Sequence, residues 1–238
     1  NPMGIRSAHC QQVFLADFDA DDPGIPPDPN NVITGTISIV VPESGGGALV
    51  VTDDGQQSPF FSQSLAMARN HGVVGDTPSF RAYPEGGPYS NGVYEISWSS
   101  YAGQTSEFGG YFALSSTTGS LLTISYGDDV YIHYTDGSTG PSGGPYPSVA
   151  ITNYSDGEYE DHVVKQFLVK LDLDNMCYDL YLNGTRVIDS HPFMNDRDSF
   201  SSFYFQATGY EENSALTTIF GIDDIQITRL SMCADADG

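Results

Sequence analysis

The chain has 238 residues, of which 39% are hydrophobic and 12% aromatic, so it can bury a core and is not a disordered chain. It has 8 Lys and Arg residues but 31 Asp and Glu residues, and the net charge of −23 argues against nucleic acid or an anionic membrane surface as a direct partner. No run of 18 apolar residues occurs, which predicts no membrane span. This composition suits a secreted protein, extracellular or at the cell surface, and it suits divalent cations.

Strands are expected almost throughout the chain. Residues 1–10 are interpreted as a lead-in segment and residues 11–238 as one domain, because no linker interrupts the succession of strands. β-Branched and aromatic residues alternate with polar ones between turn residues, which predicts strands over 13–19, 32–41, 47–53, 92–101, 111–117, 121–127, 130–135, 201–208 and 220–230. Segments 21–31, 77–92 and 136–147 are rich in Gly and Pro and are expected to be loops.

The stretch 162–193 predicts a three-stranded meander. A long alternating strand runs to about Asp172, a turn follows at Asp174 and Asn175, and "CYDLYL" is the second strand. Asn183-Gly184 then forms the type I′ turn that two-residue hairpins favour, and "TRVID" returns as the third strand. No stretch of a dozen residues has a 3.6-residue hydrophobic repeat, so little helix is expected. Short strands at close intervals indicate an all-β sandwich or barrel.

Three motifs connect the chain to a known family. "FLADFDADDPG" (14–24), "YDLYLNGTRV" (178–187) and "FGIDDIQI" (220–227) resemble sequences of the concanavalin A-like (laminin-G-like) jelly-roll superfamily. The resemblance implies an all-β fold, a two-sheet antiparallel jelly-roll sandwich in which the first and last strands lie side by side. It also implies a structural calcium ion between those strands.

The acids of the two terminal strands support the same ion. Alternation of side chains places Asp17 and Asp19 on one face of the first strand, and antiparallel pairing brings them close to the acids of the last strand. Carboxylates that are close and unpaired raise one another's pKa, a conflict that Ca²⁺ resolves with six to eight oxygen ligands. The candidate metal ligands are Asp17, Asp19, Asp21, Asp223 and Asp224.

Two other interpretations of these acids were considered. The spacing of Asp17, Asp19 and Asp21 imitates the opening of an EF-hand loop, but Asp22 replaces the glycine that such a loop needs and no helices flank it. An EF-hand is therefore rejected. The acids could instead form a solvated edge that discourages pairing with other chains, and this alternative stays open.

The catalytic motifs of related hydrolases are absent from the sequence. The Glu-x-Asp-x-x-Glu strand that glucan hydrolases of this superfamily share does not occur, and Glu158 and Glu160 lie in a turn-rich acidic stretch. Lyases built on similar jelly rolls use a His and a Tyr with an Arg or Gln that neutralises the substrate, and Tyr131 and His133 are the candidate pair here. Enzymatic activity is left uncertain and disfavoured, with a polysaccharide lyase or a glycoside hydrolase as the possibilities.

Aromatic residues of one strand predict a carbohydrate-binding surface. Tyr94 and Trp98 share one face of the strand and Tyr101 follows them, and aromatic rings stack on the C–H faces of sugars. These three residues and Arg81 are the candidate carbohydrate-binding residues. Aromatic residues of a strand also form cores, which is the competing interpretation.

Three cysteines and two sequons complete the candidate sites. A bridge between Cys10 and Cys233 is predicted if the terminal strands are neighbours, while three unpaired thiols are the alternative. Asn153 and Asn183 begin Asn-x-Ser/Thr sequons in turn-like surroundings and are candidate glycosylation sites.

Three classes of function follow. The first is a non-catalytic extracellular structural or adhesive protein, stabilised by calcium, that assembles with its own copies into a fibre or matrix, where the lead-in could reach a neighbouring copy by strand addition. The second is a carbohydrate-binding, lectin-like module with a polysaccharide as its partner. The third is a polysaccharide hydrolase or lyase, which rests on analogy of fold alone.

Overall fold

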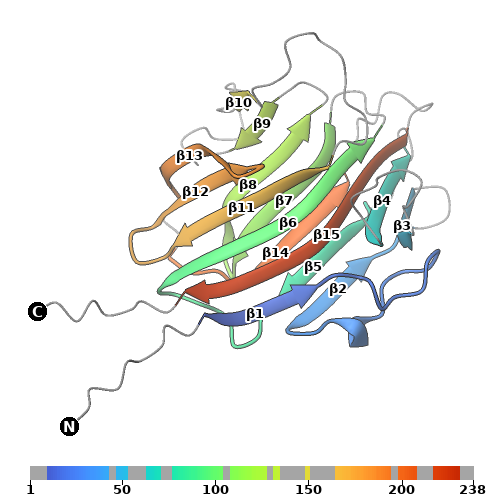
Figure 1. Cartoon of the computed structure of the whole chain (residues 1–238), viewed down its shortest axis with the longest axis horizontal. Coiled ribbons are helices and arrows are strands. Elements are labelled where there is room, and N and C mark those ends of the chain that lie inside the picture. The colour runs from blue at the N-terminus through green and yellow to red at the C-terminus, as the bar shows by residue number, and fades with distance from the viewer. Residues whose placement is uncertain are drawn as a thin grey trace, which may run out of the picture.

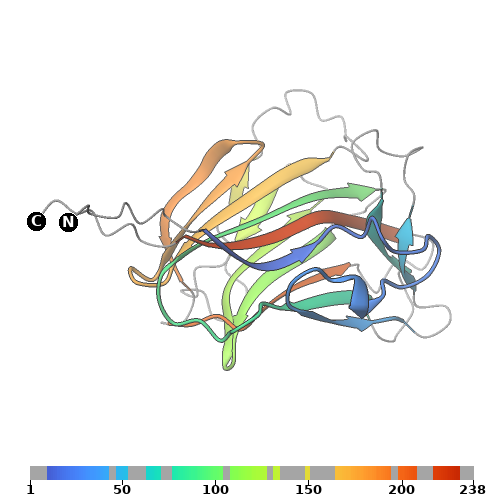
Figure 2. The same cartoon turned by 60° about the horizontal axis from the view of Figure 1, so that its bottom comes forward.

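Antiparallel strands account for nearly all the regular structure of the chain. The computed structural model describes residues 10–42, 47–52, 63–70, 77–103, 108–127, 131–134, 148–150, 164–193, 198–207 and 217–230. These residues form two sheets that face each other across a common core (Figures 1 and 2). Within these ranges the single helical element is η1, a 3₁₀ turn over Pro29–Asn31 that begins after Asp28.

The first sheet has eight strands, and the long strand β15 lies near its middle. Seven of them follow the order β13 (Thr185–Pro192), β12 (Cys177–Leu182), β11 (Lys165–Asp172), β6 (Val93–Gly103), β15 (Thr217–Leu230), β4 (Ser64–Asn70) and β3 (Gly47–Thr52), and β1 (Gln11–Ala16) pairs with β15. Strands from both ends of the chain therefore form the centre of one sheet.

The second sheet has seven strands. Their order is β10 (Ser148–Ala150), β9 (Tyr131–Tyr134), β8 (Gly119–Gly127), β7 (Phe108–Ser116), β14 (Ser202–Ala207), β5 (Ser79–Tyr83) and β2 (Thr36–Val40). All its pairings are antiparallel. The predicted all-β, two-sheet antiparallel sandwich with little helix is confirmed.

The expected strands correspond to observed ones, but three observed strands were not expected. β4 and β10 were assigned to no element, and β5 lies within 77–92, which was wrongly predicted to be a loop. Pro, Gly and Asn dominate that segment, yet "SFRAY" pairs on both sides, with β2 and with β14. The meander β11–β12–β13 is confirmed, and positive φ angles of 48° at Asn183 and 77° at Gly184 fit the predicted type I′ turn.

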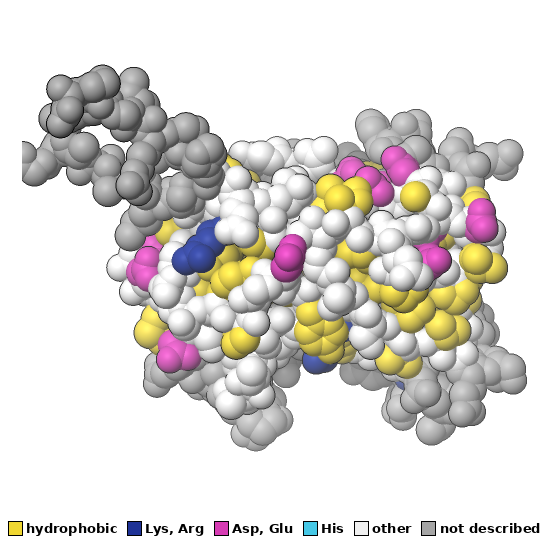
Figure 3. Space-filling view, turned by 90° about the horizontal axis from the view of Figure 1, so that it is seen from below, with side chains coloured by type: hydrophobic (Ala, Val, Ile, Leu, Met, Phe, Trp, Pro, Cys, Tyr) yellow, Lys and Arg dark blue, Asp and Glu magenta, His cyan; other side chains and the backbone are white. Residues whose placement is uncertain are grey.

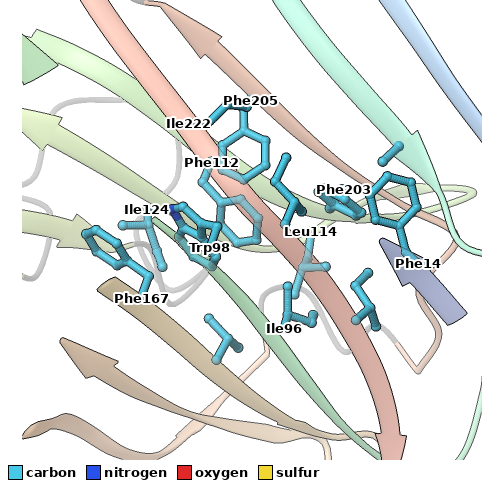
Figure 4. Packing of buried hydrophobic residues seen from close by; sticks show 14 of the residues in the cluster. Phe14, Ile96, Trp98, Phe112, Leu114, Ile124, Phe167, Phe203, Phe205 and Ile222 are labelled. Carbon is cyan, nitrogen blue, oxygen red and sulfur yellow. The ribbon is translucent and has the colours of Figure 1, made fainter. Parts of the chain in front are cut away.

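Aromatic rings from both sheets fill the space between them. Trp98 of β6 stacks on Phe167 of its own sheet and on Phe112 of the other, with ring centroids 4.9 and 4.3 Å away (Figure 4). Phe14 of β1 meets Phe203 of β14 edge to face at 5.0 Å. The terminal strand β1 is therefore part of the core rather than an addition to its rim.

The last strand exchanges neighbours along its length. On one edge it pairs with β6 throughout; on the other edge, residues 217–222 pair with β4 and residues 225–229 pair with β1. The predicted pairing of the first and last strands is confirmed, with Gln11 opposite Arg229 and Ala16 opposite Ile225. β1 and β4 thus follow each other along one edge of β15, and they meet beside Asp223 and Asp224.

A β-bulge accounts for the two acids inside the last strand. The register against β6 shifts between Asp223 and Gln226, and Asp224 has a positive φ of 51°. The inserted residue changes the phase of the strand, so that Ile222 before it and Ile225 after it both face the core. Unbroken alternation in this strand would place Asp224 on the face of Ile222; because of the bulge, Asp224 is instead exposed while Ile222 is buried.

The outer surface carries many more acids than bases. Figure 3 shows acidic side chains spread over the lower face, with hydrophobic side chains gathered between them. The large hydrophobic residues that stand exposed on the described surface are Ile25, Ile33, Val40, Val41 and Tyr83. Among the described residues, no helix is long and apolar enough to cross a membrane.

Candidate functional site

An acidic junction forms where β15 exchanges β4 for β1. We use this name for the side chains of Asp17, Asp19, Asp223 and Asp224. The backbone of Phe18 has a φ of 56°, so β1 ends at Ala16 and the chain turns away at the level of the bulge. Four carboxylates from opposite ends of the sequence therefore lie near one another, as the sequence predicted.

Asp223 is the most perturbed member of the junction. Its side chain is only 4% exposed, and among the described residues its Oδ1 atom has no hydrogen-bond partner. Burial, and after it the negative charges of Asp224, Asp19 and Asp17, raise the pKa of Asp223 to about 8, although a hydrogen bond from the backbone of Asp224 acts in the opposite direction. Burial and the charges of Asp19 and Asp17 also raise the pKa of Asp224.

Backbone carbonyls gather at the same junction. The end of the Gln63 side chain lies 2.7 Å from the carbonyl oxygen of Phe18, 3.2 Å from that of Asp19 and 3.1 Å from that of Asp21. With its amide nitrogen toward them, Gln63 donates to all three carbonyls.

The fifth predicted ligand has a different role. The Asp21 carboxylate accepts hydrogen bonds from the backbone N–H of Asp28 at 2.7 Å and from Asn31 Nδ2 at 2.8 Å, so its Oδ1 atom holds the loop before β2. The backbone carbonyl of Asp21 reaches the junction instead. Sequence reasoning missed both Gln63 and this carbonyl contribution, because backbone oxygens leave no signal in a sequence.

The junction has the donor chemistry that calcium requires. Within the described ranges, no three acidic, His or Cys side chains form a group that could hold a metal ion by themselves. The unpartnered Oδ1 of Asp223, the neighbouring carboxylates and the three converging carbonyls nevertheless supply oxygen ligands of both kinds that Ca²⁺ accepts. A calcium ion at this junction stays a prediction.

The predicted sugar platform on β6 is wrong. Tyr94 is fully buried and Trp98 is 2% exposed, so neither ring is free to stack on a ligand. The Tyr94 hydroxyl donates to the carbonyl of Asn91 at 3.0 Å, and burial raises its pKa to about 12. The competing interpretation, that these aromatic residues belong to the core, is correct for both. Tyr101 lies on β6, but its side chain is outside the described part of the structure.

Arg81 lies on the other sheet, on its outer face. On β5 the neighbours Phe80 and Ala82 face the core, so Arg81 faces outward, half-buried. Its guanidinium carbon lies 5.1 Å from the ring centroid of Tyr204, the residue opposite it on β14. The Tyr204 hydroxyl donates to Oε1 of Gln206 on the same strand. We call Arg81, Tyr204 and Gln206 the outer-face trio.

The sequence held a usable signal for two members of this trio. In "SSFYFQAT" the phenylalanines alternate with Tyr204 and Gln206, and the phenylalanines are fully buried. Once the buried face of β14 is known, the other two residues must face outward. The prediction instead followed the aromatic-rich strand 92–101, because it contains the chain's single Trp.

The proposed lyase pair lies in the same sheet as the trio. Pairing across β14, β7, β8 and β9 aligns Gln206 with Tyr111, Ser125 and His133 in one row. His133 is thus three strands from Gln206, roughly 14 Å at the usual strand spacing. The side chains of Tyr131 and His133 lie outside the described part of the structure, as do Glu158 and Glu160.

The remaining candidate residues lie at the margins of the described chain. Cys10 is exposed and precedes β1, but Cys233 is outside the described residues, so the predicted bridge stays a prediction. Asn153 is also outside them. Asn183 is exposed, and its Oδ1 accepts a hydrogen bond of 2.9 Å from the backbone N–H of Gln166.

Comparison with solved structures shows the same two-sheet, antiparallel jelly-roll fold. No family model and no curated protein matches the sequence. A sialidase superposes with a TM-score of 0.58 at 10% identity over 91% of this chain, and the binding domain of botulinum neurotoxin serotype C1 superposes with 0.56 at 12% identity over 91%. The chain spans 18% of that sialidase and 48% of that toxin domain.

A third similar structure has nearly the dimensions of this chain. An alginate lyase of polysaccharide lyase family 7 superposes with a TM-score of 0.52 at 11% identity, over 79% of this chain and 84% of the lyase. At these identities the likenesses establish the fold alone.

Proposed function

We propose that the protein is an extracellular carbohydrate-binding β-sandwich that binds a polysaccharide on the outer face of its seven-stranded sheet. The observation that carries the proposal is the outer-face trio, where a cation, an aromatic ring and an amide stand together on neighbouring strands. The ring can stack on the C–H face of a sugar, and the amide and guanidinium can hydrogen-bond its hydroxyl groups.

The similar structures support this class of ligand. One of them is a botulinum neurotoxin of type C whose cell entry depends on interaction with two ganglioside molecules, and another is the alginate lyase. Both chemistries involve saccharides on a sandwich of this fold. Self-assembly into a fibre stays a prediction, since no observation on the described residues bears on it.

The charge of the chain favours a neutral polysaccharide. A net charge of −23 repels polyuronates and sulfated polymers over distances of about a Debye length. Arg81 is the one base of the outer-face trio, and its guanidinium already lies over the Tyr204 ring. We therefore expect neutral glucans, mannans or xylans to bind more strongly than alginate or pectate.

Affinity electrophoresis in gels that contain each polymer tests the proposal. We expect retardation by at least one neutral polymer, and at least a tenfold loss of affinity in Tyr204→Ala and in Arg81→Ala. Arg186→Ala is the matched control, because Arg186 is equally charged, half-exposed, and located on β13 of the other sheet. Equal retardation of all four proteins would contradict a site at the trio.

A lyase on the same face is the second candidate. The alignment of His133 with Gln206 in one row of the sheet favours it. In β-elimination a base removes the C5 proton of a uronate, the C4–O bond breaks, a proton passes to the leaving oxygen and a C4=C5 double bond forms. Tyr131 and His133 would exchange these protons.

Product analysis separates the two candidates. Incubation with alginate, pectate and other polyuronates would generate unsaturated ends, detected by ultraviolet absorbance, if the protein is a lyase. His133→Ala would abolish that signal and leave binding of neutral polymers intact. The absence of unsaturated ends from every polyuronate would leave binding as the function.

We further propose that the acidic junction binds a structural calcium ion. The carboxylates of Asp17, Asp19, Asp223 and Asp224 and the carbonyls beside Gln63 would hold it. The ion would neutralise the buried Asp223 and tie the first strand to the last. Calcium would thus stabilise the sheet, and the chemistry of the ligand surface would belong to other residues.

A further inference from the structure

A hollow of about 600 Å³ lies on the outer face of the eight-stranded sheet, on the opposite side of the sandwich from the outer-face trio. Its volume is within the range of about 300–1,000 Å³ that is typical of small-molecule sites. No residue of the outer-face trio lines it. We call it the serine hollow.

A row of paired residues crosses five strands beneath the serine hollow. Strand pairing aligns Tyr181 of β12 with Leu168 of β11, then Ser97 of β6, Gln226 of β15 and Leu15 of β1. All five residues line the hollow. The row spans four strand spacings, roughly 19 Å, which gives an elongated surface.

The small residues at the centre explain the concavity. Ser97 lies in the middle of the row, with Leu168 and Tyr181 on one side and Gln226 and Leu15 on the other. Ser99, two positions further along β6, also lines the floor and is 7% exposed. Serine side chains are short, so the larger residues on either side rise above them.

The lining offers both polar and apolar contacts. Hydroxyl groups of two serines and amide groups of Gln166 and Gln226 can donate and accept hydrogen bonds, and the Asp224 carboxylate accepts them. Leu15, Leu168 and the Tyr181 ring supply apolar surface. A ligand that matches this lining has many hydroxyl groups and also apolar C–H faces.

The charges of the lining select a neutral ligand. Asp224 is the one charged residue among the residues that line the hollow, so a phosphate, sulfate or uronate would be repelled. The neighbouring base Lys170 is engaged elsewhere, 3.2 Å from Glu95 Oε1 and over the Tyr181 ring at 5.6 Å. A neutral saccharide satisfies both conditions.

An ordinary solvated sheet face explains these residues less well. Leu15, Leu168 and Tyr181 are each half-buried at the centre of the face, with no charged side chain between them in the row. Outward positions of strands that only meet water are usually polar. Ligand sites typically have this composition, with apolar residues around a few polar groups.

We propose that the serine hollow is a second saccharide site, which binds a neutral oligosaccharide segment. The site itself does not depend on the function proposed above. Its consequence does: with both sites, one molecule binds two glycan chains on opposite faces and can cross-link them. This would give the protein an adhesive role without any contact between its own copies.

Isothermal titration with neutral gluco-, manno- and xylo-oligosaccharides tests the proposal, in a buffer that contains calcium chloride. We expect two ligands per wild-type chain with at least one probe. Ser97→Leu fills the floor and leaves one ligand per chain, and Tyr181→Ala weakens the same binding event at least tenfold. Gln12→Leu is the control, because Gln12 is exposed on β1 and does not line the hollow.

The variants separate this proposal from the preceding one. If Tyr204→Ala loses one binding event and Ser97→Leu loses the other, both proposals hold. If Ser97→Leu abolishes all binding and Tyr204→Ala changes nothing, the serine hollow is the site and the outer-face trio is not. Unchanged affinity and stoichiometry in Ser97→Leu and Tyr181→Ala overturns the inference.

Backbone NMR on the wild-type protein covers the case in which Ser97→Leu does not fold. Titration with the tightest oligosaccharide is expected to shift the amide signals of Ser97, Leu168 and Gln226. Shifts confined to the seven-stranded sheet, with none in this row, would also overturn the inference.

Discussion

Substitution of Asp223 by Asn tests the physical basis of the acidic junction. Asp223 is 4% exposed and its Oδ1 atom has no partner among the described residues, so its negative charge is costly in the metal-free protein. Asparagine has nearly the same shape and carries no charge. The substitution therefore removes the electrostatic cost and, with it, a proposed ligand of calcium.

The magnitude follows from the pKa of Asp223. Folding raises it from the ordinary 3.8 to about 8, chiefly because the side chain is buried. At 1.36 kcal/mol per unit this corresponds to a ceiling of about 6 kcal/mol. Relaxation of the site and entry of water reduce such penalties, so we expect to measure about 2–3 kcal/mol.

The sign of the pH dependence is fixed by the direction of the shift. Because the folded chain holds the proton more tightly than the unfolded chain, the free energy of unfolding is highest below pH 4 for this group and falls as the pH rises to about 8. In chelator, the wild type should lose stability over this interval. Asp223→Asn should lose less and be the more stable protein at pH 8.

Calcium should reverse that order. The proposed ion would bind the ionised carboxylates of the folded state alone, and it would stabilise that state by about 2.7 kcal/mol at a free concentration of a hundred times the dissociation constant. The wild type should therefore gain stability from calcium at pH 8, and Asp223→Asn should gain little. Urea unfolding followed by tryptophan fluorescence, in EGTA and in calcium chloride at several pH values, measures both effects.

Asp22→Asn is the control, since it removes an equal charge from an exposed residue of the neighbouring loop. It should retain both the calcium response and the pH dependence of the wild type. Wild-type stability in EGTA that is constant or rises between pH 5 and 8 would refute the argument from burial. A full calcium response in Asp223→Asn would show that the ion, if bound, does not use this carboxylate.

Four further substitutions test side-chain packing and backbone conformation. Gly47→Ala should destabilise strongly or prevent folding, because its Cβ would lie 1.9 Å from the carbonyl oxygen of Ala68. The Cβ of Gly184→Ala meets nothing within 4 Å, so this variant should cost only the strain of its positive φ, about 1–2 kcal/mol. Urea unfolding midpoints of the two variants measure the difference. Trp98→Ala should cost about 3–5 kcal/mol in urea unfolding followed by circular dichroism, since the variant lacks the chain's single Trp and the ring stacks between Phe112 and Phe167; a loss below 1 kcal/mol would contradict that packing. Asp224→Gly should raise the thermal midpoint in EGTA, because glycine adopts a φ of 51° without strain and removes a charge next to Asp223; a lower midpoint would contradict this account of the bulge.

The periodicity of the sequence predicted most strands of the two sheets, but it did not predict the residues of the outer-face trio. Long alternating strands such as 92–101 and 220–230 were predictable, because their inward residues are large and apolar. The strand "SFRAY" was not predictable, because it is short and has turn residues on both sides. Its outward Arg81 was named as a sugar ligand, but its partners Tyr204 and Gln206 depend on which strand lies next to β5, and sequence alone does not give that neighbour.

The junction shows a different limit. Pairing of the terminal strands predicted that their acids lie close together. The sequence did not predict which acid of the last strand faces outward, because one inserted residue reverses the faces of all residues beyond it. The hydrogen bonds of the Asp21 carboxylate to Asp28 and Asn31 were not predicted either, and its role as a calcium ligand stays a prediction. Such local hydrogen bonds depend on the loop's backbone path.

The bulge also connects the junction to the serine hollow. Asp224 belongs to both, as the residue with positive φ and as one wall of the hollow. Without the inserted residue, β15 could not keep Ile222 and Ile225 both in the core while it exchanges β4 for β1. Because β1 replaces β4 at this point, Gln226 lies opposite Leu15 and not opposite a residue of β4. Leu15 thereby completes the row under the hollow. An ion that fixes the bulge would thus also fix one end of the proposed saccharide site, so calcium removal should weaken oligosaccharide binding at the serine hollow more than at the outer-face trio.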